Sequence, residues 1–361
     1  MEIVLAEPNI SQLEKDYVLD ALESGWINTT GPYITKFQDL MALTVEAKRG
    51  VAVANGTSGL FLALKIMGIR PGDKVLVPSI TFVASINAIM HSGAEPVFFD
   101  CDESLNINVE DLKTYLESEP SNVKAIMPVH IFGNPCNMIE INKLAKKYNL
   151  VVVEDACEAI GSKSNDGNCG NASDIGVFSF SFNKMITSGN GGMVITNDDE
   201  IADKIRYWIT QSKDDSVNYI HNEVGYNLGL TNIQAALGLA QLRRLDSFLS
   251  RKAEIINKYL TRINENRFFL TPLYAESSNF WFLGYKTENK DKLLKTLREN
   301  KIQARPLFAP NHKHKPFENF ERFGSLQNTS YYADRVINLP CGTTITDEQI
   351  DKVCDIIKTI E

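Results

Sequence analysis

Short apolar runs alternate with helix-like stretches between about residues 50 and 200, and this alternation is the strongest constraint on the fold. Near-continuous apolar strands that alternate with helices are typical of a largely parallel sheet covered by helices on both faces. We therefore predict an α/β fold, with ligand-binding residues just after the apolar runs, at the carboxyl ends of the strands. The apolar runs lie at 51–56, 74–79, 95–100, 124–130, 150–156, 176–182 and 191–197, and helix-like stretches lie at 58–67, 85–93 and 138–149.

The second part of the chain predicts a helical region and then a smaller domain. Thr231 or Asn232 can cap a stretch with apolar positions at helical spacing, which predicts one long helix or two in tandem. Beyond it, the short strands FWFLGYK and QARPLF alternate with helices. We predict a large domain at 1–245 and a small α+β domain at 246–361, since 361 residues at 43% hydrophobic can bury more than one core.

The last helix has two clear signals. Thr346 followed by Gln349 forms a capping box at its start. An apolar stripe then recurs at helical spacing, which predicts one buried face. The stripe consists of Ile350, Val353, Ile356, Ile357 and Ile360.

The charge balance limits the classes of partner. A net charge of -8 and a pI near 5.3 argue against non-specific binding to nucleic acid or to an anionic membrane surface. No apolar run approaches the roughly 20 residues that span a bilayer. The acidic N-terminal residues lack the charged-then-apolar pattern of a signal peptide. We therefore expect no membrane or nucleic-acid partner and a cytoplasmic location.

The cysteines and histidines do not predict a metal site. The six cysteines are scattered without a CxxC pair, which favours reduced thiols. His312 and His314 lie two residues apart, but no further ligands accompany them at a recognisable spacing. We expect no bound metal.

Three short segments carry residue types suited to chemistry. In NGTSG, Thr57 and Ser58 can cap a helix after a strand, and a helix N-terminus with free amides binds phosphate, although an ordinary capped turn has the same pattern. Asp155 ends the strand LVVVED, where a partly desolvated carboxylate needs a cation or several donors. Lys184 follows Ser179 in FSFSFNKMITSG, among neighbours that favour burial, and a lysine amine removed from water is a usable nucleophile.

Together these residues predict one cofactor, pyridoxal 5'-phosphate (PLP). Its phosphate fits the helix start near Thr57, and its ring nitrogen needs an anion such as Asp155. Its ring face fits an aromatic side chain, for which Phe82 in PSITFVAS is the candidate. Its aldehyde needs a lysine amine, which Lys184 supplies.

With these motifs in place, the chain resembles the DegT/DnrJ/EryC1/StrS sugar aminotransferases, which have the type I, aspartate aminotransferase-like PLP fold. The resemblance covers nearly the whole chain. It rests on motifs in the family's order: SGWINTTGPYITKF, NGTSGLFLAL, VPSITFVAS, VEDACEAIGS, FSFSFNKMITSGNGGMVITND, GYNLGLTNIQAALGLAQL and RPLFAPNHKHKPF.

The resemblance implies a role for each matching residue. Lys184 matches the lysine that binds PLP covalently, and Asp155 matches the acid at the ring nitrogen. The remaining matches are Glu158 for the ring hydroxyl, Phe82 for the ring face, Thr57, Ser58 and Ser179 for the phosphate, Arg305 and His312 near the nucleotide-sugar, and Trp26 and Gly31 at the entrance.

Asn227 matches an asparagine that reaches the phosphate in the partner subunit, so the resemblance implies a homodimer with shared active sites. Two positions depart from the family pattern. Asn190 replaces a Glu or Asp, and Gly229 replaces the usual arginine.

The resemblance also implies the reaction, an amino transfer from L-glutamate to C4 of a nucleotide-linked 4-keto-6-deoxy sugar used for surface glycans and lipopolysaccharide. A UDP-linked, N-acetylated sugar is the leading substrate, because TQSKDDSVNYIHNEVGYN, SNFWFLG and RPLF resemble enzymes of the bacillosamine and legionaminic acid pathways. The alternative is the GDP-4-keto-6-deoxymannose used by GDP-perosamine synthases.

Three other classes of protein fit the sequence less well. A sugar dehydratase on this fold carries histidine where this chain has Lys184. A non-catalytic regulatory protein on the PLP fold would lose the amine that Lys184 keeps. A dinucleotide-binding domain would show GxGxxG after its first strand, and the sequence has none there.

Overall fold

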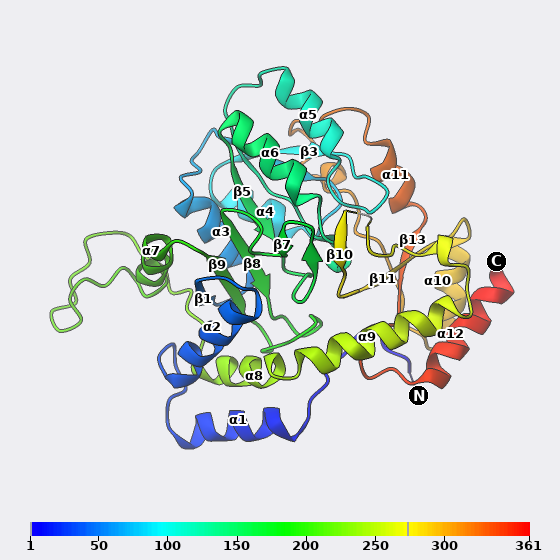
Figure 1. Ribbon diagram of the computed structural model, residues 1–361, viewed down its shortest axis with the longest axis horizontal. Coiled ribbons are helices and arrows are strands. Elements are labelled where there is room, and N and C mark those ends of the chain that lie inside the picture. The colour runs from blue at the N-terminus through cyan, green and yellow to red at the C-terminus, as the bar shows by residue number, and fades with distance from the viewer. Residues whose placement is uncertain (1, 273) are drawn as a thin grey trace.

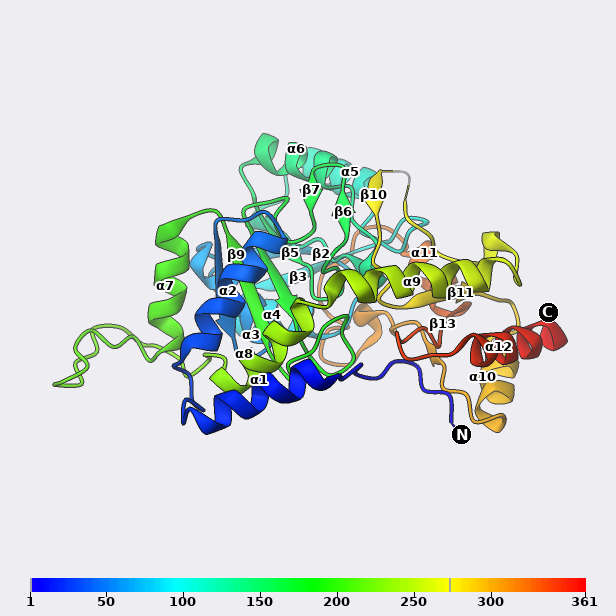
Figure 2. The ribbon, with the colours of Figure 1, turned by 60° about the horizontal axis from the view of Figure 1, so that its bottom comes forward.

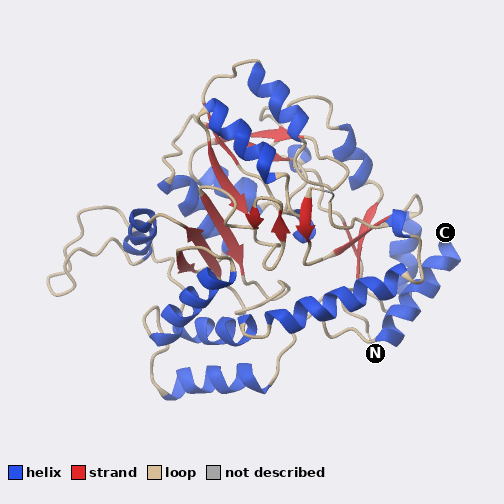
Figure 3. Cartoon of the chain, viewed as in Figure 1, coloured by secondary structure: helices blue, strands red, loops and turns tan. Residues whose placement is uncertain are grey.

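A computed structural model describes residues 2–272 and 274–361 and shows a central seven-stranded sheet (Figure 1, Figure 3). The strand order is β1-β9-β8-β5-β4-β2-β3. β9 is antiparallel to both of its neighbours, and every other adjacent pair is parallel. This confirms the predicted α/β class. The strands are β1 (Arg49–Val53), β2 (Lys74–Pro78), β3 (Glu95–Phe99), β4 (Val123–Ile126), β5 (Val151–Asp155), β8 (Ile175–Ser179) and β9 (Gly192–Thr196).

Helices cover both faces of this sheet, as the near-continuous apolar strands require. In β5, Val153 packs in the core that contains α3, α4 and α7, whereas its neighbour Val152 packs in the core that contains α5 and α6. A third core, with α2 and α8, covers the β8 and β9 end of that second face. The helices are α1 (Gln12–Glu23), α2 (Pro32–Thr44), α3 (Gly56–Ile66), α4 (Ala84–His91), α5 (Val109–Glu117), α6 (Met138–Tyr148), α7 (Asp199–Ile209) and α8 (Asn232–Leu242).

Helix α3 corrects one detail of the sequence analysis, because Thr57 and Ser58 do not cap it. The cap is Asn55, whose extended backbone places its side chain to accept a 2.9 Å hydrogen bond from the Ser58 amide. A capping residue precedes the first helical residue, and here the helix already begins at Gly56. Thr57 and Ser58 therefore lie in the first turn.

The helical region after Thr231 is two helices in tandem, α8 and α9 (Leu245–Leu260). Thr231 caps α8 and forms a capping box with Gln234. Figure 2 shows α9 running from the large sheet toward the C-terminal helices. Ile255 and Tyr259 near its end are buried in the core of the C-terminal part of the chain. The predicted boundary at 245/246 falls at the first residue of α9.

The C-terminal part has its own three-stranded antiparallel sheet, in the order β11-β13-β12. The sequence segment FWFLGYK forms a shorter strand than predicted, because β11 begins only at Leu283. Its elements are β11 (Leu283–Lys286), α10 (Lys290–Glu299), β12 (Arg305–Pro306), α11 (Gln327–Ala333), β13 (Val336–Leu339) and α12 (Asp347–Ile360). A further small sheet has the order β10-β6-β7, with β6 (Lys163–Ser164), β7 (Gly167–Asn168) and β10 (Ala275–Ser277).

Helix α12 confirms the capping box at Thr346 and Gln349. Three residues of the predicted stripe, Ile350, Val353 and Ile357, are buried. The other two, Ile356 and Ile360, are half-buried and pack against the same core.

The N-terminal segment joins the C-terminal core. Ile3 pairs with Ile302 in a parallel bridge, and its carbonyl accepts a 2.8 Å hydrogen bond from the amide of Gln303. Leu5 is buried in the same core. The core of the predicted small domain therefore includes residues from both ends of the chain.

No described helix has the length and apolar composition needed to cross a membrane. Over residues 2–272 and 274–361, no cluster of three or more His, Cys, Asp or Glu side chains could hold a metal ion.

Candidate active site

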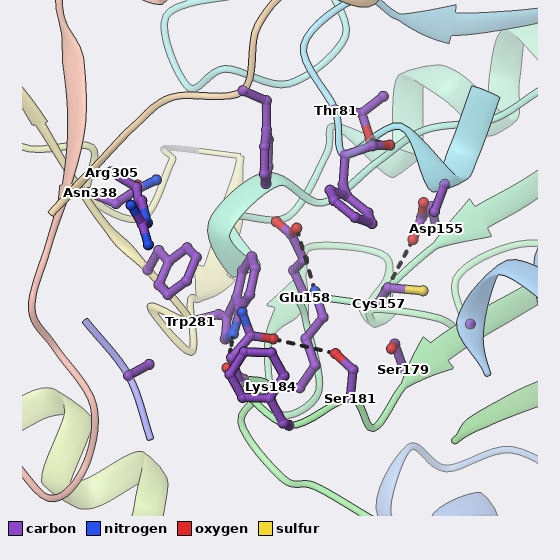
Figure 4. Close-up of a pocket in the computed structure, with 18 of the residues that line it drawn as sticks. Thr81, Asp155, Cys157, Glu158, Ser179, Ser181, Lys184, Trp281, Arg305 and Asn338 are labelled. Carbon is purple, nitrogen blue, oxygen red and sulfur yellow. Dashed lines mark hydrogen bonds and ion pairs between the residues drawn. The ribbon is translucent and has the colours of Figure 1, made fainter. Parts of the chain in front are cut away.

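A cavity of about 550 Å³ lies where the carboxyl ends of the large sheet's strands face the small C-terminal sheet (Figure 4). Asn55 and Gly56 enter it after β1, Asp155 and Glu158 after β5, and Lys184 after β8. This is the edge at which the sequence predicted the chemistry. The facing wall comes from the C-terminal part and includes Trp281, Arg305 and Asn338.

The start of α3 forms one end of the cavity. Gly56 leaves no space for a side chain, because a Cβ there would lie 2.8 Å from Cys157 Sγ and 3.0 Å from Ser179 Cβ. The backbone of the first helical turn therefore lies directly against the cavity wall. The hydroxyls of Thr57 and Ser179 have no hydrogen-bond partner among the described residues. Free amides at a helix start together with free hydroxyls suit a phosphate group.

Asp155 is buried at the end of β5 and is held from two sides. Ser85 Oγ donates a 2.6 Å hydrogen bond to Asp155 Oδ2, and the Cys157 amide donates a 3.1 Å bond to Oδ1. Each carboxylate oxygen has two lone-pair sites, so each can accept one more donor. A protonated ring nitrogen in the cavity fits that remaining capacity.

Lys184 projects into the cavity with 11% of its side chain exposed. Its Nζ lies 3.6 Å from Glu158 Oε1 and 3.6 Å from the centroid of the Trp281 ring. Figure 4 shows the three side chains together, with a dashed line between the Lys184 amine and the Glu158 carboxylate. Lys184 is therefore buried, as predicted from sequence, and its amine faces Glu158.

Glu158 has an altered acidity. Burial raises the pKa of its carboxyl, and the nearby Lys184 ammonium and the Phe132 amide only partly offset this, which leaves the pKa at about 7. The Phe132 amide donates a 2.8 Å hydrogen bond to Oε2, which leaves Oε1 facing the lysine. Glu158 is thus able to exchange a proton near neutral pH.

Phe82 lines the cavity with 55% of its surface exposed. Its only described aromatic neighbour is Phe308, whose ring centroid lies 5.9 Å away. A large exposed ring on a cavity wall can stack on a planar ligand.

The other predicted residues divide into two groups. Arg305 is exposed on β12 and lines the cavity. His312 does not reach the described lining, because its ring is buried and its Nδ1 lies 2.7 Å from Ser79 Oγ. Ser58, Asn227, Trp26 and Gly31 also lie outside the described lining.

Gly31 has a structural explanation of its own. Its φ is 144°, and a Cβ there would lie 2.4 Å from Asn232 Cγ. The Asn232 side chain bridges the Tyr33 amide and the Trp26 carbonyl at this point.

The two departures from the family pattern occupy different places. Asn190 lines the cavity, and its main-chain carbonyl accepts a 2.9 Å hydrogen bond from Gln234 Nε2. Gly229 forms an isolated bridge with Val53 outside the described lining.

Sequence reasoning missed several residues of the site, among them Ser85, Cys157, Trp281 and Asn338. Trp281 was assigned to a strand, and no local pattern distinguishes an aromatic that lines a cavity from one that fills a core. Ser85 is the last residue of the motif VPSITFVAS, but nothing in that motif indicates a role for it. Only the packing of α4 against the end of β5 brings Ser85 to Asp155.

Comparison with known proteins agrees with this geometry. The model of the DegT/DnrJ/EryC1/StrS aminotransferase family matches residues 8–358. The chain belongs to this family. GDP-perosamine synthase of Escherichia coli O157:H7 is 38% identical over 98% of this chain and 97% of its own length. GDP-perosamine synthase of Vibrio cholerae is 35% identical over 99% of this chain and 98% of its own length.

Solved structures support the same assignment. A DegT/DnrJ/EryC1/StrS aminotransferase of Brucella abortus has a TM-score of 0.90 and 28% identity, over 96% of this chain and 95% of that one. This confirms the type I, aspartate aminotransferase-like fold. The chain is a PLP-dependent sugar aminotransferase, and PLP is its cofactor. The readings as a dehydratase or a dinucleotide-binding domain are thereby set aside.

The residues of this cavity fit PLP. The side-chain-free helix start at Gly56 and the two free hydroxyls suit its phosphate, and the doubly held Asp155 suits its ring nitrogen. The buried amine of Lys184 lies within the same cavity to bind its aldehyde.

Proposed function

We propose that this aminotransferase moves the amino group of L-glutamate to C4 of a nucleotide-linked 4-keto-6-deoxy sugar, and that the sugar is GDP-4-keto-6-deoxymannose. The similarity to GDP-perosamine synthases over nearly the full length carries the choice of nucleotide. It favours the GDP-linked sugar over the UDP-linked, N-acetylated sugar that was the leading substrate from sequence. The meeting of Lys184, Glu158 and Asp155 in one cavity supports the transfer chemistry.

Each residue of the cavity has a defined task in this proposal. PLP, when bound, supplies an aldehyde that captures amines and a ring that withdraws electrons. Asp155 would hold the ring nitrogen in its protonated form, while Thr57 and Ser179 would hold the phosphate. We assign Ser58 to the phosphate as well, although it lies outside the described lining. Phe82 stacks on the ring face. Lys184, once free, takes a proton from the α-carbon of L-glutamate with its Nζ and later returns one to the sugar carbon.

The sugar nucleotide would enter from the exposed side of the cavity. Arg305 is exposed at the mouth, where its guanidinium can pair with a diphosphate. We assign His312, Trp26 and Gly31 to the same nucleotide-sugar region, although a side-chain rearrangement is needed for His312 to leave Ser79.

We further propose a homodimer with shared active sites. The segment before Asn227 projects away from the body of the chain (Figures 1 and 2). It exposes large apolar side chains, namely Val217, Tyr219, Ile220 and Val224. Asn227 lies exposed at its base, in a position to reach a neighbouring subunit. The six free cysteines support a reducing compartment, and we propose the cytoplasm.

A substrate panel tests the reaction. The purified protein is incubated with L-glutamate and one of three nucleotide-linked 4-keto-6-deoxy sugars: a GDP-linked sugar, a dTDP-linked sugar, or a UDP-linked sugar with an N-acetyl group. The masses of the products are then measured by mass spectrometry. We expect amination of the GDP-linked sugar and equimolar 2-oxoglutarate, and neither product with Lys184→Ala. Amination of the UDP-linked sugar alone would show that the UDP-linked, N-acetylated sugar expected from the sequence is the substrate. No amination of any of the three sugars would refute the proposal.

A mixing experiment tests the shared sites. Lys184→Ala and Asn227→Ala are each expected to be nearly inactive alone. A mixed dimer carries one site in which both residues are native and one in which both are replaced. Mixing the two variants after mild dissociation should therefore give mixed dimers with up to about half the activity of a wild-type dimer. Absence of any recovery, with mixed dimers verified by native mass spectrometry, would contradict shared active sites.

A further inference from the structure

Trp281 contacts Lys184 as closely as Glu158 does, although the sequence assigned Trp281 no role. The Nζ of Lys184 lies 3.6 Å from the centroid of the Trp281 ring and 3.6 Å from Glu158 Oε1. An ammonium over an indole face is attracted by the negative face of the ring, and the attraction strengthens when water is excluded. Trp281 is only 4% exposed and the Lys184 side chain only 11%, so bulk water has little access to this contact. The ring face and the Glu158 carboxylate together form a seat for a charged amine.

The indole also holds the loop that carries the lysine. Trp281 Nε1 donates a 2.7 Å hydrogen bond to the carbonyl of Asn183, the residue immediately before Lys184. This bond crosses from the C-terminal part of the chain to the loop after β8. The ring therefore fixes both ends of the lysine, its backbone through Asn183 and its amine through the ring face.

The backbone of Trp281 is held just as firmly. Its amide donates a 2.8 Å hydrogen bond to Asn279 Oδ1, and the Asn279 side chain in turn donates a 2.9 Å bond to the carbonyl of Glu158. Its carbonyl accepts a 2.9 Å bond from the buried Lys252 Nζ. The indole, the lysine loop and the Glu158 loop are thus one connected unit.

The residue before the indole has an unfavourable backbone. Phe280 has a φ of 50°, a left-handed conformation that a bulky residue adopts only when its surroundings require it. The turn at Phe280 directs the chain so that the next ring lies over the lysine.

We propose that Trp281 is a positioning residue of the aminotransferase, and that its indole face holds the Lys184 amine inside the cavity whenever that amine is free. The lysine must leave the cofactor, carry a proton and return in every cycle. A seat that stabilises the charged amine keeps the proton carrier beside the reacting carbon instead of letting it swing into solvent. This inference deepens the proposed transfer chemistry and is independent of which sugar is the substrate.

The seat is tested first on cofactor-free protein by NMR. The protein is produced with lysine labelled with ¹³C at Cε, and the Lys184 signal is identified by its loss in Lys184→Arg. Protons over an aromatic face are shifted upfield, so we expect the Lys184 Cε protons upfield of the other lysines. The shift should vanish in Trp281→Leu and persist in part in Trp281→Phe. A wild-type Lys184 signal in the ordinary range, or one unchanged in Trp281→Leu, would overturn the proposal.

The consequence for the reaction is tested by the half-reaction of the PLP-loaded protein with L-glutamate, followed by absorbance in a stopped-flow instrument. We expect the maximal rate of Trp281→Leu to fall about ten- to thirtyfold, as for loss of a desolvated cation–π contact, with little change in the glutamate concentration at half-maximal rate. Trp281→Phe keeps a ring face and should stay within about fivefold of wild type. Trp208→Leu, which removes an indole that is not part of the described cavity lining, should match wild type.

The outcomes separate the possible explanations. Equal losses in the Leu and Phe variants would show that only the Asn183 hydrogen bond matters and would overturn the role of the ring face. If Trp281→Leu does not fold, the test rests on Trp281→Phe. An unshifted Lys184 signal in Trp281→Phe together with a wild-type rate would refute the proposed role of the ring face. A wild-type protein that does not react with L-glutamate would refute the proposed function while leaving the NMR result to judge the seat.

Discussion

Ser85 and Asp155 lie 70 residues apart in the chain and meet at the cavity, where the serine hydroxyl donates a 2.6 Å hydrogen bond to Asp155 Oδ2. The bond orients one carboxylate oxygen and leaves lone pairs on both oxygens for the ring nitrogen of the cofactor. It also ties the start of α4 to the end of β5. Ser85 is therefore expected to act through Asp155.

Replacement of Ser85 by alanine should weaken PLP binding. A hydrogen bond to a charged acceptor contributes about 1.5 to 3 kcal/mol, which corresponds to about ten- to hundredfold in the dissociation constant. Titration of cofactor-free protein with PLP, followed by absorbance, measures the change. Ser92→Ala is the matched control, since that serine bonds only the Ile89 carbonyl at the other end of the same helix. Equal affinities for the two variants would contradict the role of Ser85.

The Glu158→Gln substitution should remove a pH dependence of stability. Burial raises the pKa of the Glu158 carboxyl to about 7, so the folded cofactor-free protein keeps a proton there that the unfolded chain loses above about 4.5. The contribution to the free energy of unfolding is fully present below about pH 4.5 and is lost as the pH rises to about 7. The glutamine variant should gain up to about 3 kcal/mol over wild type across this window. Urea unfolding of both proteins at pH 5, 6, 7 and 8 measures this gain. A difference in the free energy of unfolding that does not change with pH would refute the prediction.

The stability contribution of Glu14 should depend on pH in the opposite direction. Its burial would raise the pKa, but hydrogen bonds from Ser11, Arg244 and Gln241 outweigh this and lower the pKa to about 2. Its stabilising contribution is present above about pH 4.5 and is lost as the pH falls toward 2. The advantage of wild type over Glu14→Gln, up to about 3 kcal/mol, should shrink between pH 6 and 3 in urea unfolding. Glu23→Gln, at the exposed end of the same helix, should follow wild type, and parallel curves for all three proteins would count against the assignment.

A methyl group at position 56 should disturb the phosphate end of the cavity. In Gly56→Ala the new Cβ would lie 2.8 Å from Cys157 Sγ, so either the helix start or the cysteine must move. We expect a cost of about 1 to 3 kcal/mol in the free energy of unfolding and weaker PLP binding. The double variant Gly56→Ala with Cys157→Ala removes the sulfur and should recover part of both losses. No recovery would show that contact with Ser179 Cβ, at 3.0 Å, dominates.

The sequence predicted the site's large-domain wall well and its small-domain wall poorly. Asp155, Ser179 and Lys184 lie at or just after the ends of apolar runs, and parallel strands bring their carboxyl ends together. The alternation of strands and helices, and the place of these residues relative to the strands, were therefore enough to predict that they meet. Trp281 and Asn338 reach the cavity only because the small sheet packs there, a contact between segments about 100 residues or more apart from Lys184 in the chain. No local pattern reports such packing.

Two local details were also beyond the sequence. The run GGMVITN predicted a strand but gave no sign that β9 runs opposite to its neighbours, since strand direction depends on the path of the connecting chain. Asn55 and Thr57 are both residue types that cap helices, and only the extended backbone of Asn55 identifies it as the cap.

The bridge between Ile3 and Ile302 has a consequence for biosynthesis. Ile3 must stay unpaired during translation until Ile302 has left the ribosome. All strands of the seven-stranded sheet precede Ile302, so a nascent chain can assemble that sheet before the C-terminal core is complete.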